Sequence, residues 1–96
     1  MGKRLPLIAG NWKMYKTGDE ATQTARRLKE LVAAAAGVEI MIAPPFTALA
    51  QVAAVITASN IALGAQNMHW EAQGAYTGEI APTMLVNAGC RYVIIG

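Results

Sequence analysis

The chain has 96 residues, a formal net charge of +2 and one cysteine, with 54% hydrophobic and 15% charged residues. This length allows one domain at most, and the composition argues against disorder. The positive charge forms no basic block, so we expect no nucleic-acid partner. No apolar run approaches the roughly 18 residues of a membrane span, and the N-terminus lacks a signal-peptide layout. We therefore expect a cytoplasmic location and no membrane partner. Cys90 has no partner for an internal disulfide and is predicted to be a buried structural thiol.

The first predicted element is a strand over residues 5–10, which ends abruptly in Asn11-Trp12-Lys13. In parallel α/β proteins ligands bind at the carboxyl ends of strands. Asn11 and Lys13 share parity, so an extended backbone would direct both side chains to the same side. Most loop lysines are solvated, so this stretch alone marks a candidate site without assigning Lys13 to a ligand.

A helix is predicted to follow, opened by the capping box Thr17-Gly18-Asp19-Glu20 and stopped by Gly37. Its charged residues indicate a solvated face with local ion pairs rather than a binding patch. Its apolar face is predicted to comprise Ala21, Ala25, Leu28, Val32 and Ala35.

Residues 38–43 read as a second strand, and Pro44-Pro45 favours a helix start just after it. That helix carries an apolar stripe, and a third strand follows over residues 60–65. Gly64 inside this strand suggests a close backbone approach or crowding. The stripe consists of Leu49, Val52, Ala53 and Ile56.

The connection over residues 66–81 is long, and connections of this length are usually functional or disordered. Trp70, Tyr76 and Ile80 are too apolar for a disordered tether, so we expect an ordered arm that packs on something. Pro82 then opens a short helix that Gly89 closes, and residues 92–96 form the fourth predicted strand.

The alternation of strands and helices predicts an α/β fold of right-handed parallel β-α-β units. If the strands run in sequence order, all helices lie on one face of the sheet, and the other face and both edge strands remain bare. Exposing a sheet face forfeits several kcal/mol, at about 25 cal/mol per Å². Three solutions remain open: more chain completes a barrel, another copy does, or the strand order winds both ways.

Five motifs, in order and spacing, resemble the triosephosphate isomerase family across essentially the whole chain. They are Ala9-Gly10-Asn11-Trp12-Lys13-Met14, Ala43-Pro44-Pro45-Phe46, Gly64-Ala65-Gln66-Asn67, Gly74-Ala75-Tyr76-Thr77-Gly78-Glu79 and Tyr92-Val93-Ile94-Ile95-Gly96. The resemblance implies that residues 1–96 are the N-terminal half of a (β/α)₈ barrel, β-α-β-α-β-α-β, ending at strand four. The active site of such a barrel lies at the carboxyl ends of its strands.

The family interconverts dihydroxyacetone phosphate and glyceraldehyde 3-phosphate by enediol proton transfer, without cofactor or metal. The resemblance implies that Lys13 is the catalytic cation facing this phosphorylated triose, and that Asn11 binds the substrate. Gln66 and Asn67 would support the site from the end of strand three. A fixed charge in a dry site stabilises a developing oxyanion by several kcal/mol.

The resemblance also implies a homodimer, formed through the 66–81 arm. Its interface would include Met14 and the tip of the arm, where Thr77 approaches Asn11 and Lys13 of the neighbouring subunit. Glu79 would anchor the arm rather than act as an acid or base. The tip comprises Tyr76, Thr77, Gly78 and Glu79. We interpret His69 as a surface or interface side chain.

Two family features are not found in residues 1–96: the electrophilic histidine of a His-Ser-Glu motif that follows Ile94-Ile95-Gly96, and a catalytic glutamate further on. We therefore expect no meaningful isomerase activity from this chain alone. Ala81 stands where the family usually has serine, which removes a helix cap worth about 1 kcal/mol. The alternative interpretation is a non-catalytic half-barrel that self-assembles through open sheet edges and the arm.

Overall fold

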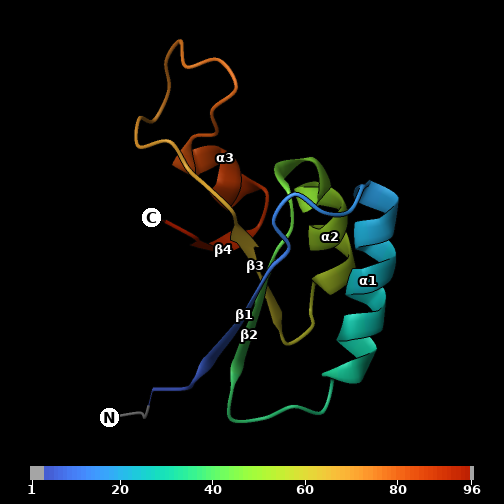
Figure 1. The fold of residues 1–96 in the computed structure, drawn as a ribbon. Helices are drawn as coiled ribbons and strands as arrows, with labels where there is room; N and C mark the ends of the chain where they lie inside the picture. Colours follow the sequence, from blue (N-terminus) through green and yellow to red (C-terminus); the bar gives the residue numbers. More distant parts are fainter. Residues whose placement is uncertain (1–3, 96) are drawn as a thin grey trace.

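The computed structural model describes residues 4–95, which form one parallel sheet with three α-helices on its flanks (Figure 1). Its elements are β1 (Leu7–Asn11), α1 (Gly18–Leu31), β2 (Glu39–Ala43), the 3₁₀ helix η1 (Phe46–Ala48), α2 (Leu49–Ile56), β3 (Ile61–Ala65), α3 (Pro82–Asn87) and β4 (Cys90–Val93). The predicted alternation of strands and helices is confirmed.

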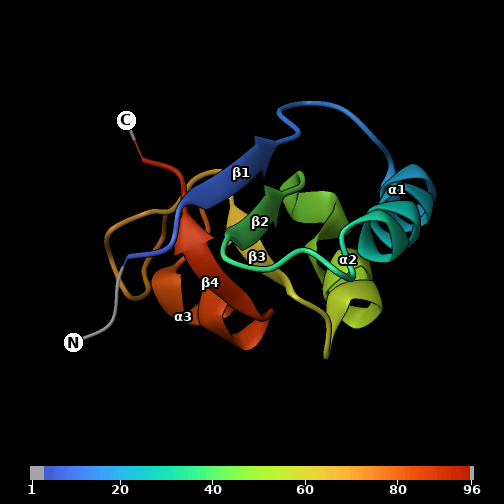
Figure 2. The same ribbon diagram turned by 90° about the horizontal axis from the view of Figure 1, so that it is seen from below.

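The four strands are hydrogen-bonded in the order β1-β2-β3-β4, and every pair is parallel (Figure 2). Register pairs Ile8 with Ile40 and Ile40 with Ile61. The strand order therefore runs straight through the sheet, which excludes the solution in which it winds both ways. The carboxyl ends of all four strands meet at one edge of the sheet.

The core lies between the central strands and the helices α1 and α2, which pack side by side (Figure 1). The predicted α2 stripe is confirmed: Leu49, Val52 and Ile56 are buried, and Ala53 packs against them. From the sheet, alternate residues of β2 and β3 meet this stripe. These are Ile40, Ile42, Ile61, Leu63 and Ala65.

The unburied apolar surface of the sheet is concentrated on β1. Leu7 is 46% exposed and Ile8 57% exposed, although they point to opposite faces. On β2, by contrast, Met41 is buried on the face away from the helices, where its side chain lies over Gly64. The sheet face that was expected to be bare is therefore partly covered at β2 and β3 by the Met41 side chain. β1, in contrast, exposes apolar side chains on both of its faces.

The start of α1 follows the sequence prediction, but its end does not. The Glu20 carboxylate accepts the Thr17 N–H at 2.9 Å and the Thr17 hydroxyl at 3.0 Å, which confirms the capping box. The helix ends at Leu31, well before Gly37. At this end the Asn60 amide donates to the carbonyl of the C-cap residue Val32 at 2.6 Å, a long-range contact that caps the helix.

The strand ends also shift relative to prediction. β1 begins two residues later than expected and β4 begins two earlier, while Gly96 lies outside the described residues. A register shift between Leu63 and Gly64 accompanies the pairing of β3 with β4. The crowding predicted at Gly64 is confirmed, because a Cβ there would meet Met41 Sδ at 2.5 Å; the neighbour is a side chain rather than backbone.

The arm over residues 66–81 leaves β3 and returns to α3 as a projecting loop (Figure 1). The two ends of the arm are joined at its base, where the backbone N–H of His69 donates to the Ile80 carbonyl at 2.9 Å. The His69 ring stacks on Trp70 and contacts Tyr76, with centroids 4.3 and 4.2 Å away. The arm therefore has internal order without regular secondary structure. None of the helices between Arg4 and Ile95 combines the length and apolarity that a membrane crossing requires.

Candidate functional site at the carboxyl end of β1

Lys13 lies in the turn that directly follows β1, and its backbone is left-handed, with a φ of 54°. The Asn11 side chain holds this turn, because its Oδ1 accepts the Lys13 N–H at 2.9 Å. The backbone is therefore not extended between these residues, and the parity argument for their shared direction is wrong. Asn11 and Lys13 are nevertheless close together, joined by an Asx-type hydrogen bond rather than by strand alternation. Both side chains are exposed.

Gln66 ties the Lys13 turn to the rest of the sheet. Its Nε2 donates to the carbonyl of Lys13 at 2.7 Å and to that of Ala43 at 2.8 Å. One amide at the end of β3 thus bridges the ends of β1 and β2. Sequence reasoning predicted a supporting role for Gln66, but both acceptors are backbone carbonyls, which no residue pattern reveals. Asn67, predicted beside it, is exposed and makes no hydrogen bond within residues 4–95.

Trp12 packs against the core, and its backbone N–H donates to the Ala43 carbonyl at 3.1 Å. The Lys16 ammonium lies 5.9 Å from the centre of the indole ring, within range of a cation–π interaction. Sequence reasoning missed Lys16, which like Lys13 has a positive φ, here 78°. The loop between β1 and α1 therefore carries two lysines: Lys16 lies over the Trp12 indole, and Lys13 lies at the carboxyl end of β1.

The arm tip does not join this site within the chain. Tyr76, Thr77, Gly78 and Glu79 are all exposed, and no hydrogen bond in the described region links them to Asn11 or Lys13. The tip is shaped by a tight turn in which the Glu79 N–H donates to the Tyr76 carbonyl at 3.0 Å. Met14, the other residue assigned to an interface, is 95% exposed.

The titratable groups with shifted pKa values lie outside this cluster. Cys90 was predicted to be buried, but it is half-buried, and this partial burial raises the pKa of its thiol. Hydrogen bonds from Thr17 lower the pKa of Glu20, and a hydrogen bond to Glu39 raises the pKa of Tyr92. Among residues 4–95, no cluster of three or more His, Cys, Asp or Glu side chains could hold a metal ion. The site offers a positioned cation and amides, the groups that bind an anion.

Comparisons with known proteins cover nearly the whole chain. The family model for triosephosphate isomerase covers residues 6–96. The triosephosphate isomerase of Chloroflexus aurantiacus is 59% identical over 93 residues, covering 97% of this chain and 37% of the relative. That of Geotalea uraniireducens is 54% identical with the same coverage.

Structural comparison agrees with the sequence comparison. The crystal structure of triosephosphate isomerase from Bartonella henselae has a TM-score of 0.88 and 40% identity, over 95% of this chain and 37% of that one. The chain thus spans little more than a third of the length of these relatives, and its sheet corresponds to the first half of their barrel. Fold, motifs and alignments together identify the chain as a member of the triosephosphate isomerase family.

Proposed function

We propose that the protein containing this chain interconverts dihydroxyacetone phosphate and glyceraldehyde 3-phosphate in the cytoplasm. Family membership supports this reaction, and the observation that carries the proposal is the Lys13 turn. A lysine held in a left-handed conformation by Asn11 and Gln66 is oriented before any ligand arrives. The entropy cost of fixing this turn is then part of folding rather than of substrate binding. More of the electrostatic attraction between Lys13 and the substrate therefore remains for stabilising the transition state.

In this reaction a base removes a proton next to the carbonyl, and negative charge develops on the carbonyl oxygen. The Lys13 ammonium would stabilise that charge and the substrate phosphate, while the Asn11 amide would donate a hydrogen bond to the substrate. Gln66 acts through the backbone, because its amide fixes the Lys13 carbonyl. It is therefore a positioning residue rather than a catalytic one.

The test compares Lys13→Met with Lys16→Met in the natural polypeptide that contains this chain. Lys13→Met should lower kcat/KM by a factor on the order of 10²–10³, the range found when one oxyanion-stabilising group is removed. Lys16→Met removes a nearby cation that lies on Trp12 and should change kcat/KM less than about fivefold. Near-normal turnover by a folded Lys13→Met variant would contradict the proposal.

The same proposal assigns the arm to a homodimer interface. Exposed apolar surface on Met14 and Tyr76, together with the ordered turn at the tip, supports an arm that docks on another subunit. Thr77→Arg should shift the protein toward monomer in sedimentation analysis. Thr83→Arg, on the exposed side of α3, is the matched control and should leave the assembly intact.

The chain assayed alone should show no turnover above the buffer rate. Proton abstraction needs a base within about 3 Å of the carbon-bound proton. Of the carboxylates, Glu20 caps α1 and Glu39 accepts a hydrogen bond from Tyr92, and neither contacts the Lys13 turn. Turnover by the purified 96-residue polypeptide at a rate near that of its full-length relatives would refute this expectation.

A second candidate function is a non-catalytic half-barrel that assembles with a second copy. The specific observation in its favour is β1, which is an edge strand with Leu7 and Ile8 exposed on opposite faces. Two four-stranded units supply the eight strands that close a barrel. Sizing chromatography with light scattering should then give a defined dimer that Ile8→Lys disrupts and Leu31→Lys, at the exposed end of α1, does not.

A further inference from the structure

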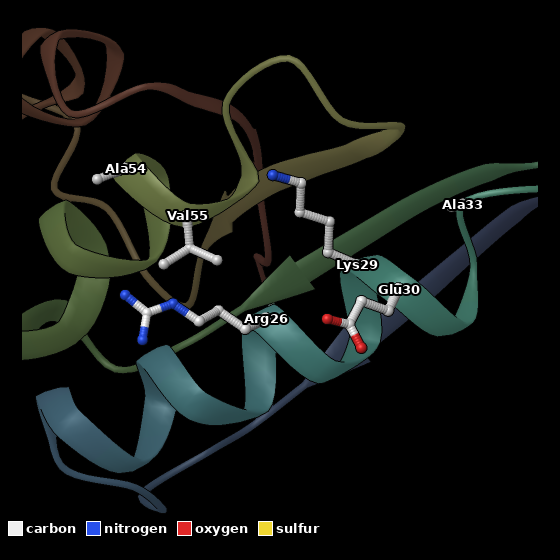
Figure 3. Close-up of a pocket in the computed structure, with 6 residues that line it drawn as sticks. All are labelled: Arg26, Lys29, Glu30, Ala33, Ala54 and Val55. Atoms are coloured by element: carbon white, nitrogen blue, oxygen red, sulfur yellow. The ribbon is translucent and has the colours of Figure 1, made fainter.

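A groove between α1 and α2 combines two unpaired cations with an apolar floor (Figure 3). It has a volume of about 610 Å³, within the size range of ligand sites in proteins. Its walls come from one stripe of α1 and the turn after it, spaced by three, one and three residues, and from the facing side of α2. The lining residues are Arg26, Lys29, Glu30, Ala33, Ala54 and Val55.

The charges in this groove are arranged to leave positive potential over the apolar floor. Figure 3 shows the Arg26 and Lys29 side chains extending from α1 toward α2 on either side of Val55, while the Glu30 carboxylate stays on the α1 side. Sequence spacing predicted local ion pairs here. Within residues 4–95, neither cation lies within 4 Å of a carboxylate or makes a hydrogen bond, so both have free donors.

The floor determines what kind of anion fits. Ala33, Ala54 and Val55 present only methyl groups, and Val55 is half-buried against the core. From Arg26 to Glu30 the α1 side of the groove rises about 6 Å, the length of a short alkyl chain, and Ala33 follows in the turn after the helix. An inorganic anion could pair with the two cations, but it would leave the apolar floor of the groove exposed to water.

We propose that the α1–α2 groove binds an amphipathic anion, with a phosphate or carboxylate head between Arg26 and Lys29 and a short apolar body on Ala54 and Val55. Charge complementarity supports this ligand class, because Arg26 offers a planar fork and Lys29 a point charge, one on each side of Val55. The groove is lined by α1, the turn after it and α2, and it shares no residue with the Lys13 turn. Binding here is therefore separate from the proposed isomerase site.

The test uses octyl phosphate, below its micelle concentration, with the natural polypeptide that contains this chain. Calorimetry should show saturable binding at this site, weakened about tenfold or more by Arg26→Ala and by Lys29→Ala. Val55→Glu should abolish binding because it places a negative charge on the floor. Arg27→Ala removes a neighbouring exposed arginine that does not line the groove, and should leave affinity unchanged.

Three outcomes would overturn the proposal. One is binding of inorganic phosphate as tight as that of octyl phosphate, which would make the apolar floor irrelevant. Another is an equal loss of octyl phosphate affinity in Arg26→Ala and Arg27→Ala, which would indicate that binding depends only on the net charge of the protein. The third is binding to anionic phospholipid vesicles with no binding of monomeric octyl phosphate, which would indicate a membrane surface. Because kcat for triose phosphate should be unchanged in these variants, failure here leaves the proposed function intact.

Discussion

Replacing Gln66 by alanine removes the donor that joins the ends of three strands. The lost hydrogen bonds run to the carbonyls of Lys13 and Ala43, at 2.7 and 2.8 Å. Each such bond contributes about 0.5–1.5 kcal/mol net. The exposed Lys13 carbonyl can turn to water, and the Ala43 carbonyl keeps the Trp12 N–H at 3.1 Å as a second donor. We therefore expect a loss of about 1–2 kcal/mol rather than the full sum.

Urea unfolding of Gln66→Ala against the parent measures this loss as a change in midpoint at constant m-value. Asn67→Ala is the matched control, since its side chain is exposed and makes no hydrogen bond in the described region. Hydrogen exchange at the Lys13 N–H, which Asn11 holds, should accelerate in Gln66→Ala only. Equal stability of the two variants, or unchanged exchange at Lys13, would refute the view that Gln66 positions this turn.

Three further changes test the local packing and caps. Gly64→Ala should destabilise by about 1–3 kcal/mol in urea, because its Cβ would overlap Met41, whereas Gly10→Ala has 3.6 Å of clearance and should be tolerated. Ala81→Ser should raise the Tm of the protein, since α3 begins without a side-chain cap and a serine contributes about 1 kcal/mol there. The pKa of Glu20 is lowered in the folded state, so its stabilisation is present above the ordinary glutamate pKa and lost as pH falls through the folded value. Acid titrations of unfolding should therefore lose part of their pH dependence in Glu20→Gln; an unchanged profile would contradict the cap.

The order of elements could be predicted because it depends on local patterns. The spacing of its apolar residues predicted the Leu49–Ile56 helix. Pro82 and the Thr17 capping box predicted two helix starts, and the structure confirms both. Motif spacing likewise predicted the family, which the comparisons show. These signals lie within a few residues of the feature they specify.

The predictions that failed depended on distant contacts. Gly37 looked like the end of the first helix, but Asn60, far along the chain, caps it at Val32. Asn11 and Lys13 were expected to share a strand face, yet a side-chain hydrogen bond turns the backbone between them. The acceptors of Gln66 were invisible for the same reason, because main-chain carbonyls carry no sequence signature.

Under the role proposed for Lys13, its left-handed conformation sets stability against activity at a single position. An L-residue held there costs about 1–2 kcal/mol relative to glycine. A library screened only for heat resistance should therefore drift toward Gly or Asn at position 13, whereas a screen for turnover should restore lysine. The residue retained at this position thus reports which pressure has acted on a given lineage of the sequence.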